Sequence, residues 1–268
     1  MKSGDKYFGK RVAVVFGLFV ILSTVIGCMV SSRSILAQAS TLRDSVYNDV
    51  SARHYVFFQT SDGAQLSGWF YDRGEGSELV VCYPGNACNA GMFIEYAEAD
   101  VARSYLMLNY RGYGSSSSLL SEENMVQDAK EALLHFSGRI KAEKVTLLGF
   151  SLGTGVAVQV AASGTPVARL VLAAPFDSMA HICGISGVGR LLTKDHFDSV
   201  RFAPDVTCPV FVVYSREDSV VPPCNTGRLL SAFNIIPSVK VVNGTHGEVI
   251  SHPDNRRLII DVLNSWKN

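Results

Sequence analysis

Ser151 stands in a local pattern that can turn a serine hydroxyl into a nucleophile. An apolar run at 144–150 with β-branched residues ends beside the serine, Gly149 and Gly153 flank it, and the small residues of 154–162 predict a helix. The spacing Gly-x-Ser-x-Gly between a strand and a helix predicts a tight, strained turn that lifts the hydroxyl out of a sheet. A Cβ at either glycine would clash with neighbouring backbone. Because the positive end of the helix points to the serine, the pattern indicates acyl transfer.

A serine hydroxyl also needs a base and a group that orients the base. Asp218 follows an apolar strand, in the loop at its carboxyl end, and His246 lies near glycines after the last predicted strand. The order Ser151, Asp218, His246 along the chain is the order that accompanies this type of turn. We therefore predict these three as the catalytic residues. Glu217 and His252 remain the alternatives for the acid and the base.

The negative charge that forms on the substrate oxygen during acyl transfer requires backbone N–H donors. The turn itself presents the N–H of Leu152. For the second donor we select the N–H of Asn86, in the loop 84–90, because Gly85 lets the backbone there approach a substrate. An ordinary polar turn is the alternative interpretation of this loop. The proposed chemistry requires neither a metal ion nor an organic cofactor.

The elements around these residues follow from periodicity. Segments 54–60 and 65–71 alternate polar and apolar positions around an Asp-Gly turn and predict an antiparallel hairpin. Further strands are expected at 79–83, 105–110, 144–150, 169–173, 210–214 and 239–242, and helices at 92–103, 121–137, 154–162, 224–233 and 256–266. This alternation predicts an α/β fold with a mostly parallel sheet, an antiparallel edge and helices on both faces. Ligands bind beyond the carboxyl ends of such strands, where the predicted catalytic residues fall.

The N-terminal segment 1–30 differs in composition from the rest. Lys6, Lys10 and Arg11 precede an uncharged apolar run over 12–30, which is just long enough to cross a hydrocarbon core of about 30 Å as a helix. The basic residues predict a cytoplasmic N-terminus and a folded domain on the other side of the membrane. Three outcomes stay open: a single-span anchor, a cleaved signal peptide, and a lipoprotein processed at Cys28. Residues 31–53 are a polar stem, and 54–268 form the domain.

The overall composition suits one globular domain with this appendage. The chain has 268 residues, 47% of them hydrophobic, and a formal net charge of zero. No basic stripe points to nucleic acid as a partner, and the oligomeric state is left open. The six cysteines show no Cys-x-x-Cys pair that would indicate a metal site, and Cys82, within an apolar strand, is expected to be a core residue. The sequence does not assign a disulfide among the other cysteines.

Over residues 54–266 the chain resembles the serine hydrolases of the α/β-hydrolase superfamily. The resemblance is carried by Gly-Asn-Ala at 85–87, Asn-Tyr-Arg-Gly-Tyr-Gly-Ser at 109–115, the turn at Ser151, Asp-x-x-Val-Pro at 218–222 and Gly-Thr-His at 244–246. It is similar to the compact branch of membrane-anchored lysophospholipases and protein depalmitoylases. One departure is Pro84, where the family usually has histidine. In this family, the residues at the positions of Arg111 and Tyr113 brace the loops.

The resemblance implies an α/β-hydrolase fold with a small cap and an acyl-enzyme mechanism. The cap is expected between Pro175 and Pro204, with one or two helices and apolar residues (Ile182, Ile185, Val188, Leu191, Leu192). A small apolar cap beside a membrane favours lipid-like carboxylic esters or thioesters as small-molecule substrates. A peptidase of the same fold and a catalytically silent binding scaffold remain the alternatives.

Overall fold

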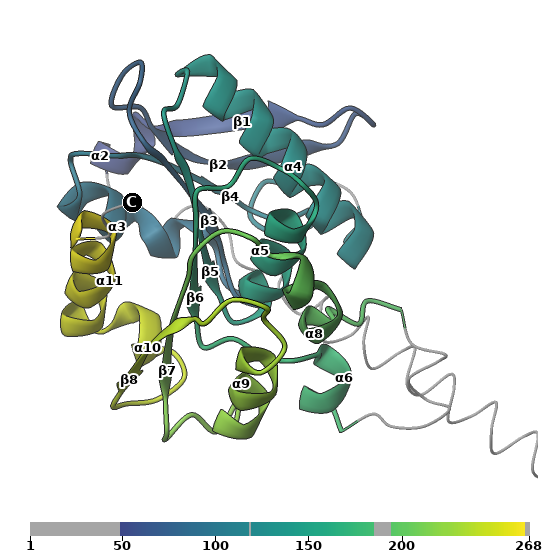
Figure 1. Ribbon diagram of the computed structural model, residues 1–268. Helices are drawn as coiled ribbons and strands as arrows, with labels where there is room; N and C mark the ends of the chain where they lie inside the picture. The colour runs from purple at the N-terminus through teal and green to yellow at the C-terminus, as the bar shows by residue number, and fades with distance from the viewer. Residues whose placement is uncertain (1–48, 118, 185–193, 266–268) are drawn as a thin grey trace, which may run out of the picture.

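The domain is built on a twisted, mostly parallel sheet. A computed structural model describes residues 49–117, 119–184 and 194–265. Within them the eight strands lie in the order β1-β2-β4-β3-β5-β6-β7-β8 (Figure 1). Their bounds are β1 Tyr55–Gln59, β2 Gln65–Tyr71, β3 Leu79–Tyr83, β4 Ser104–Leu108, β5 Val145–Phe150, β6 Arg169–Ala173, β7 Val210–Ser215 and β8 Ser238–Val242. All strands predicted from periodicity are confirmed, with ends shifted by two residues at most.

The antiparallel edge is the predicted hairpin. Strand β1 pairs with β2 in the register Tyr55↔Trp69 to Gln59↔Gln65, and β2 pairs antiparallel with β4. Gly63, in the connecting turn, has φ +88°, a conformation that residues with a Cβ rarely adopt. Strands β3 to β8 are parallel to one another. Their carboxyl ends therefore meet at a single edge of the sheet, as the fold prediction requires.

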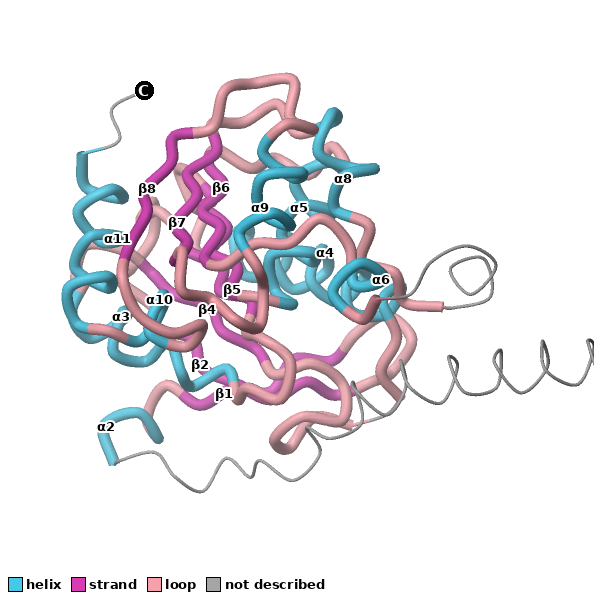
Figure 2. The backbone as a smooth tube through the Cα atoms, turned by 90° about the horizontal axis from the view of Figure 1, so that it is seen from below, coloured by secondary structure: helices cyan, strands magenta, loops and turns pink. Residues whose placement is uncertain are grey.

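Helices cover both faces of the sheet. On one side lie α4 and α5 with α8 and α9; on the other lie α3, α10 and α11 (Figures 1 and 2). The 3-10 turn η3 contacts α5. The helix bounds are α2 Asp49–Ala52, η2 Ala90–Phe93, α3 Ile94–Ala99, α4 Glu122–Arg139, α5 Leu152–Ala162, α6 Met179–Ile182, α8 Ser199–Phe202, η3 Ala203–Asp205, α9 Pro223–Leu230, α10 Glu248–Ser251 and α11 Pro253–Ser265. Helices on both faces confirm the predicted three-layer architecture.

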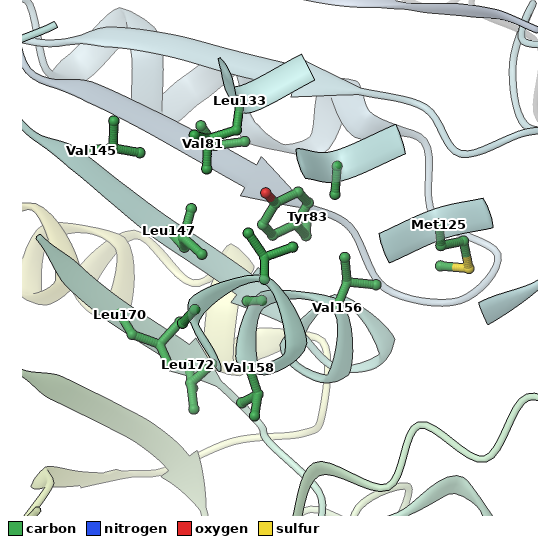
Figure 3. Close-up of a cluster of buried hydrophobic side chains, with 14 of the residues drawn as sticks. Val81, Tyr83, Met125, Leu133, Val145, Leu147, Val156, Val158, Leu170 and Leu172 are labelled. Atoms are coloured by element: carbon green, nitrogen blue, oxygen red, sulfur yellow. The ribbon is translucent and has the colours of Figure 1, made fainter. Parts of the chain in front are cut away.

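The side chains of each central strand alternate between two apolar clusters. Val81 and Leu147 point to the α4–α5 side, where they pack with Leu133 and Val156 (Figure 3). Val80, Cys82 and Leu148 contribute to the cluster beneath α3 and α11. Strands that are buried on both faces need apolar residues at every position, which explains their uninterrupted apolar sequence. Cys82 is 1% exposed, so its expected place in the core is confirmed.

The helix predicted over 92–103 is shorter than expected. It consists of the 3-10 turn η2 and of α3, which ends at Ala99. Asp100 ends the helix, because its carboxylate accepts hydrogen bonds from the backbone N–H of Ala102, from Arg103 and from the hydroxyl of Tyr105. A side chain that satisfies nearby donors in this way competes with continued helix.

Two sequence predictions fall wholly or partly outside the described residues. The proposed membrane segment 1–30 lies outside them, as do Cys28 and most of the stem. None of the helices in the described ranges has the length and apolar character needed to cross a bilayer. Of the predicted cap, the short helices α6 and α8 are described, whereas Ile185, Val188, Leu191 and Leu192 lie in 185–193.

Candidate active site

Ser151 occupies a strained turn between β5 and α5. Its backbone has φ 49° and ψ −118°, and its N–H donates to the carbonyl of Ala173 on β6. A residue with a Cβ adopts this conformation only when its surroundings enforce it. Here they do: a Cβ at Gly149 would lie 2.6 Å from the carbonyl oxygen of Gly153, and one at Gly153 would lie 2.0 Å from that of Tyr83. The predicted steric need for both glycines is confirmed.

Asp218 lies in the loop that follows β7, and its side chain is buried. One carboxylate oxygen, Oδ1, accepts the backbone N–H groups of Val220 and Val221 at 2.9 and 2.8 Å. The other, Oδ2, lies 2.7 Å from Nδ1 of His246. The loop geometry therefore fixes the carboxylate and leaves one oxygen for the imidazole.

His246 lies between β8 and α10, in reach of both partners. Its Nδ1 faces Asp218, and its Nε2 lies 2.9 Å from Oγ of Ser151. The imidazole packs against the ring of Phe150, with ring centroids 5.0 Å apart. The structure thus brings together three side chains that are up to 95 residues apart in the chain. A base oriented by a carboxylate and bonded to a hydroxyl is the arrangement that activates serine.

The two alternatives for the acid and the base are not part of this arrangement. Glu217 is exposed, and its backbone N–H donates to the hydroxyl of Ser215. His252 lies 3.9 Å from Asp254 with a half-exposed imidazole. Within the described ranges neither side chain makes a hydrogen bond to Ser151.

The loop predicted to supply an N–H donor is held by two tyrosine hydroxyls. Tyr113 donates to Oδ1 of Asn86 at 2.9 Å, and Tyr110 donates to the carbonyl of Pro84 at 2.9 Å. Burial raises the pKa of Tyr113 to about 12, so its hydroxyl keeps its proton at neutral pH. Ala87, next in the loop, has φ +55°. The two hydroxyls therefore fix the loop 84–90, although Pro84 stands where the family usually has histidine.

Leu152 is the first residue of α5. Its N–H belongs to the first turn, whose N–H groups have no carbonyl partner within the helix. This group and the N–H of Asn86 stay predictions as oxyanion donors. Sequence reasoning identified Tyr113 as a residue that braces a loop, but it missed Tyr110 and Phe150. The sequence shows that both residues are aromatic, but it does not show that they contact Pro84 and His246.

Arg111 is a buried brace between the first hairpin and α4. Its guanidinium donates to both oxygens of Asp128 and to both oxygens of Asp62, at 2.7 to 2.9 Å. The hydrogen bond from Arg111 is the main reason that the pKa of Asp62 is lowered well below its usual value. None of these hydrogen bonds joins Arg111 to Ser151 or His246. These bonds join the first hairpin to α4, which agrees with the structural role that the resemblance implies.

The cysteines near the site do not compete with the serine. Cys88, within the loop 84–90, is free and partly buried, and burial raises the pKa of its thiol. A thiol that keeps its proton is a weak nucleophile. The described cysteines, Cys82, Cys88, Cys183, Cys208 and Cys224, form no disulfide. Within the described ranges, no group of three His, Cys, Asp or Glu side chains is placed to bind a metal ion.

Comparison with known proteins agrees with the fold. A family model described as the alpha/beta hydrolase fold matches residues 78–185. An uncharacterised protein of Mycobacterium tuberculosis is 34% identical over 200 residues, which cover 69% of this chain and 70% of that protein. Lysophosphatidylserine lipase ABHD12 of Danio rerio is 30% identical over 206 residues, which cover 68% of this chain and 53% of that protein.

Solved structures that are similar to this chain have the same fold. The esterase Pf2001 of Pyrococcus furiosus superposes with a TM-score of 0.65 at 17% sequence identity, over 79% of this chain and 91% of that one. The hydrolase GrgF of a Penicillium species also gives a TM-score of 0.65, at 14% identity. At such identities the likeness concerns the fold alone. Together with the family match and the mycobacterial relative, it shows that the chain belongs to the α/β-hydrolase family.

Proposed function

We propose that this protein is a serine hydrolase that cleaves carboxylic esters or thioesters through an acyl-enzyme intermediate. One observation carries the proposal: the imidazole of His246 lies 2.9 Å from the hydroxyl of Ser151 and 2.7 Å from the carboxylate of Asp218. In the first step, Nε2 of His246 takes the proton of Ser151 as Oγ attacks the carbonyl carbon. Asp218 holds the imidazole in the required tautomer and stabilises the positive charge that forms on it.

The second half of the reaction returns the enzyme to its starting state. The tetrahedral intermediate collapses, and His246 gives its proton to the leaving alcohol or thiol. Water then attacks the acyl-enzyme, again with His246 as the base, and releases the carboxylic acid. We assign the N–H groups of Leu152 and Asn86 to the oxyanion in both steps; one such donor contributes about 2.7–4 kcal/mol of transition-state stabilisation.

Lipid-like acyl substrates are the class we favour. The zebrafish relative is named as a lysophosphatidylserine lipase, and the apolar run over 12–30 has the length and composition of a membrane segment. We therefore propose that the domain works beside a bilayer, on its non-cytoplasmic face, where single-chain lipids are accessible.

The nucleophile assignment is tested by covalent labelling. A fluorophosphonate probe should label the wild-type protein, and the variant Ser151→Ala should not be labelled although it keeps the wild-type unfolding temperature. The control Ser163→Ala changes a serine in the turn after α5, outside the site, and should be labelled normally. Labelling that persists in Ser151→Ala would refute the assignment.

A panel of p-nitrophenyl esters of increasing chain length, assayed beside amide substrates, separates the remaining alternatives. A long-chain optimum would support the lipid class. Turnover of amide substrates at rates similar to those of esters would favour a peptidase. A folded protein with no turnover of any ester would point to a binding scaffold.

A further inference from the structure

Asp177 is a buried carboxylate outside the Ser-Asp-His arrangement, and it holds the side chains of an arginine and a histidine. It lies just before α6 and is fully buried. Its Oδ1 accepts the N–H of Ser178 and the amide of Asn225 on α9, at 2.8 and 2.9 Å. Its Oδ2 accepts from Nε of Arg228 on α9 and lies 2.5 Å from Nδ1 of His181 on α6. One carboxylate therefore fixes side chains of two helices.

The charge state of this group is well defined. Burial alone would raise the pKa of Asp177, but the hydrogen bonds from Arg228, Asn225, His181 and the Ser178 N–H lower it overall. The carboxylate is consequently ionised at neutral pH. The same ion pair raises the pKa of Arg228. A fully bonded, charged carboxylate of this kind orients the side chains that are bonded to it.

Arg228 and His181 both line a surface cavity of about 640 Å³. Their side chains are 45% and 42% exposed. Within the described ranges, Nε2 of His181 makes no hydrogen bond, and the guanidinium of Arg228 has only the Cys224 thiol as a partner besides Asp177. Two residues that line the cavity therefore have side-chain nitrogens that Asp177 does not hold.

The cavity lies at the same edge of the sheet as Ser151. Helix α6 follows the carboxyl end of β6, and α9 follows that of β7, on one side of the sheet (Figure 2). Ala173, the last residue of β6, accepts the N–H of Ser151, and Asp177 follows four residues later. Thr226 of α9 donates to the carbonyl of Pro175 and ties α9 to this segment. Ser151, His181 and Arg228 therefore lie on elements that meet at one edge of the sheet.

We propose that Arg228 and His181 form a subsite for the phosphate of the substrate's head group, a proposal that rests on the proposed function. A guanidinium edge and an imidazole from two helices suit an anion with several oxygens. Asp198 lines the same cavity, and its negative charge favours a head group that carries an ammonium beside the phosphate. The substrate class is thus a single-chain ester of a zwitterionic, amine-bearing phosphodiester. The volume of the cavity, about 640 Å³, is within the range of small-molecule sites, about 300–1,000 Å³.

Binding is measured first without catalysis. The full-length Ser151→Ala protein in detergent is titrated calorimetrically with glycerophosphoethanolamine, which has the head group but no acyl chain. We expect saturable binding that weakens about tenfold or more in His181→Asn and in Arg228→Lys. Asparagine keeps a donor near the position of Nδ1 for Asp177 but lacks the second nitrogen, so it separates binding from folding. Arg201→Gln, which removes an exposed arginine of α8 outside the cavity, is the matched control and should bind normally.

The ligands of the titration distinguish the sources of phosphate. Glycerophosphoethanolamine should bind more tightly than glycerol 3-phosphate and inorganic phosphate. Equal affinity for inorganic phosphate would indicate a free-phosphate site and overturn the head-group assignment. Absence of saturable binding, or binding that both variants leave unchanged, would overturn the subsite itself.

Kinetics then separate this proposal from the proposed function. For active enzyme, the ratio of kcat/KM on lysophosphatidylethanolamine to that on a monoacylglycerol of the same chain should fall about tenfold in Arg228→Lys and His181→Asn. Arg201→Gln should keep the wild-type ratio. An unchanged ratio would refute the subsite while leaving the hydrolase intact. Failure of the folded wild-type protein to hydrolyse any p-nitrophenyl ester of the panel would instead refute the hydrolase, whatever the titration shows.

Discussion

The carboxylate of Asp218 has two tasks, one for each oxygen. Oδ1 closes its own loop through the N–H groups of Val220 and Val221, and Oδ2 orients the imidazole of His246. A substitution that keeps the first oxygen and replaces the second therefore separates loop structure from catalysis.

Asp218→Asn should leave the fold intact and slow the reaction. The amide oxygen can still accept the two loop N–H groups, but the NH2 group then faces Nδ1 of His246 and favours the tautomer that cannot accept a proton from Ser151. We expect kcat for a p-nitrophenyl ester to fall on the order of 10³–10⁴-fold. Thermal unfolding should change little. Near-wild-type turnover would show that Asp218 does not orient the base, and Glu217→Gln serves as the matched control that should keep activity.

The hydroxyl of Tyr113 donates to Asn86 in the loop 84–90, so we expect it to act on this loop rather than on the substrate. Tyr113→Phe removes the hydrogen bond to Asn86, which is worth about 0.5–1.5 kcal/mol, so we expect kcat to fall up to about tenfold with KM nearly unchanged. Tyr83→Phe is the matched control: its hydroxyl is buried at the end of β3 with no hydrogen-bond partner among the described residues. Equal kinetics for the two variants would show that the loop does not depend on Tyr113.

At the scale of elements, the close approach of α5 to β3 sets the position of the nucleophile. The helix begins directly after Ser151, and Gly153 in its first turn touches the backbone of Tyr83 at the carboxyl end of β3. Any side chain at this position would push the helix away from the sheet. The serine would move with it, since Leu152 alone separates the two residues.

Gly153→Ala should therefore cost both stability and activity. A Cβ 2.0 Å from a carbonyl oxygen cannot be accommodated without a backbone shift, and we expect a loss of about 1–3 kcal/mol or more in the free energy of unfolding. Gly138→Ala, in α4, is the matched control, because a Cβ there meets nothing within 4 Å. It should be neutral or stabilise by up to about 1 kcal/mol. Urea unfolding of both variants checks this, and a Gly153→Ala protein as stable as the wild type would contradict it.

The same elements show what a sequence can and cannot predict. The strands and the Ser151 turn were predictable because their signals are local: apolar runs, an Asp-Gly turn and two glycines at fixed spacing. The place of β4 between β2 and β3 was not, since no local pattern encodes which strands become neighbours. The end of α3 was missed because it depends on the side-chain partners of Asp100. The pairing of Asp177 with Arg228 joins residues 51 positions apart and becomes visible only in the fold.

At the scale of the whole molecule, the described ranges contain two apolar cores. One extends from Phe58 to Phe233 on the α4–α5 side, and the other from Trp69 to Leu263 beneath α3 and α11. The side chains of Ser151 and His246 lie where the strands between these cores end. Burial of this extent is what an independent domain needs, because apolar area removed from water is the main stabilising contribution to folding.

We therefore expect a protein that lacks residues 1–48 to fold and to keep its chemistry. Its kcat/KM on p-nitrophenyl butyrate, a water-soluble ester, should stay within about twofold of the full-length value, because no residue of the proposed mechanism is removed. Its activity on lysophospholipid in vesicles should fall, because the predicted membrane segment 12–30 no longer raises the enzyme's concentration at the bilayer. The same lipid dispersed in detergent is the control and should be hydrolysed equally by both proteins. Equal activity on vesicles would refute the membrane role, and loss of activity on the soluble ester would show that the domain needs its N-terminal residues.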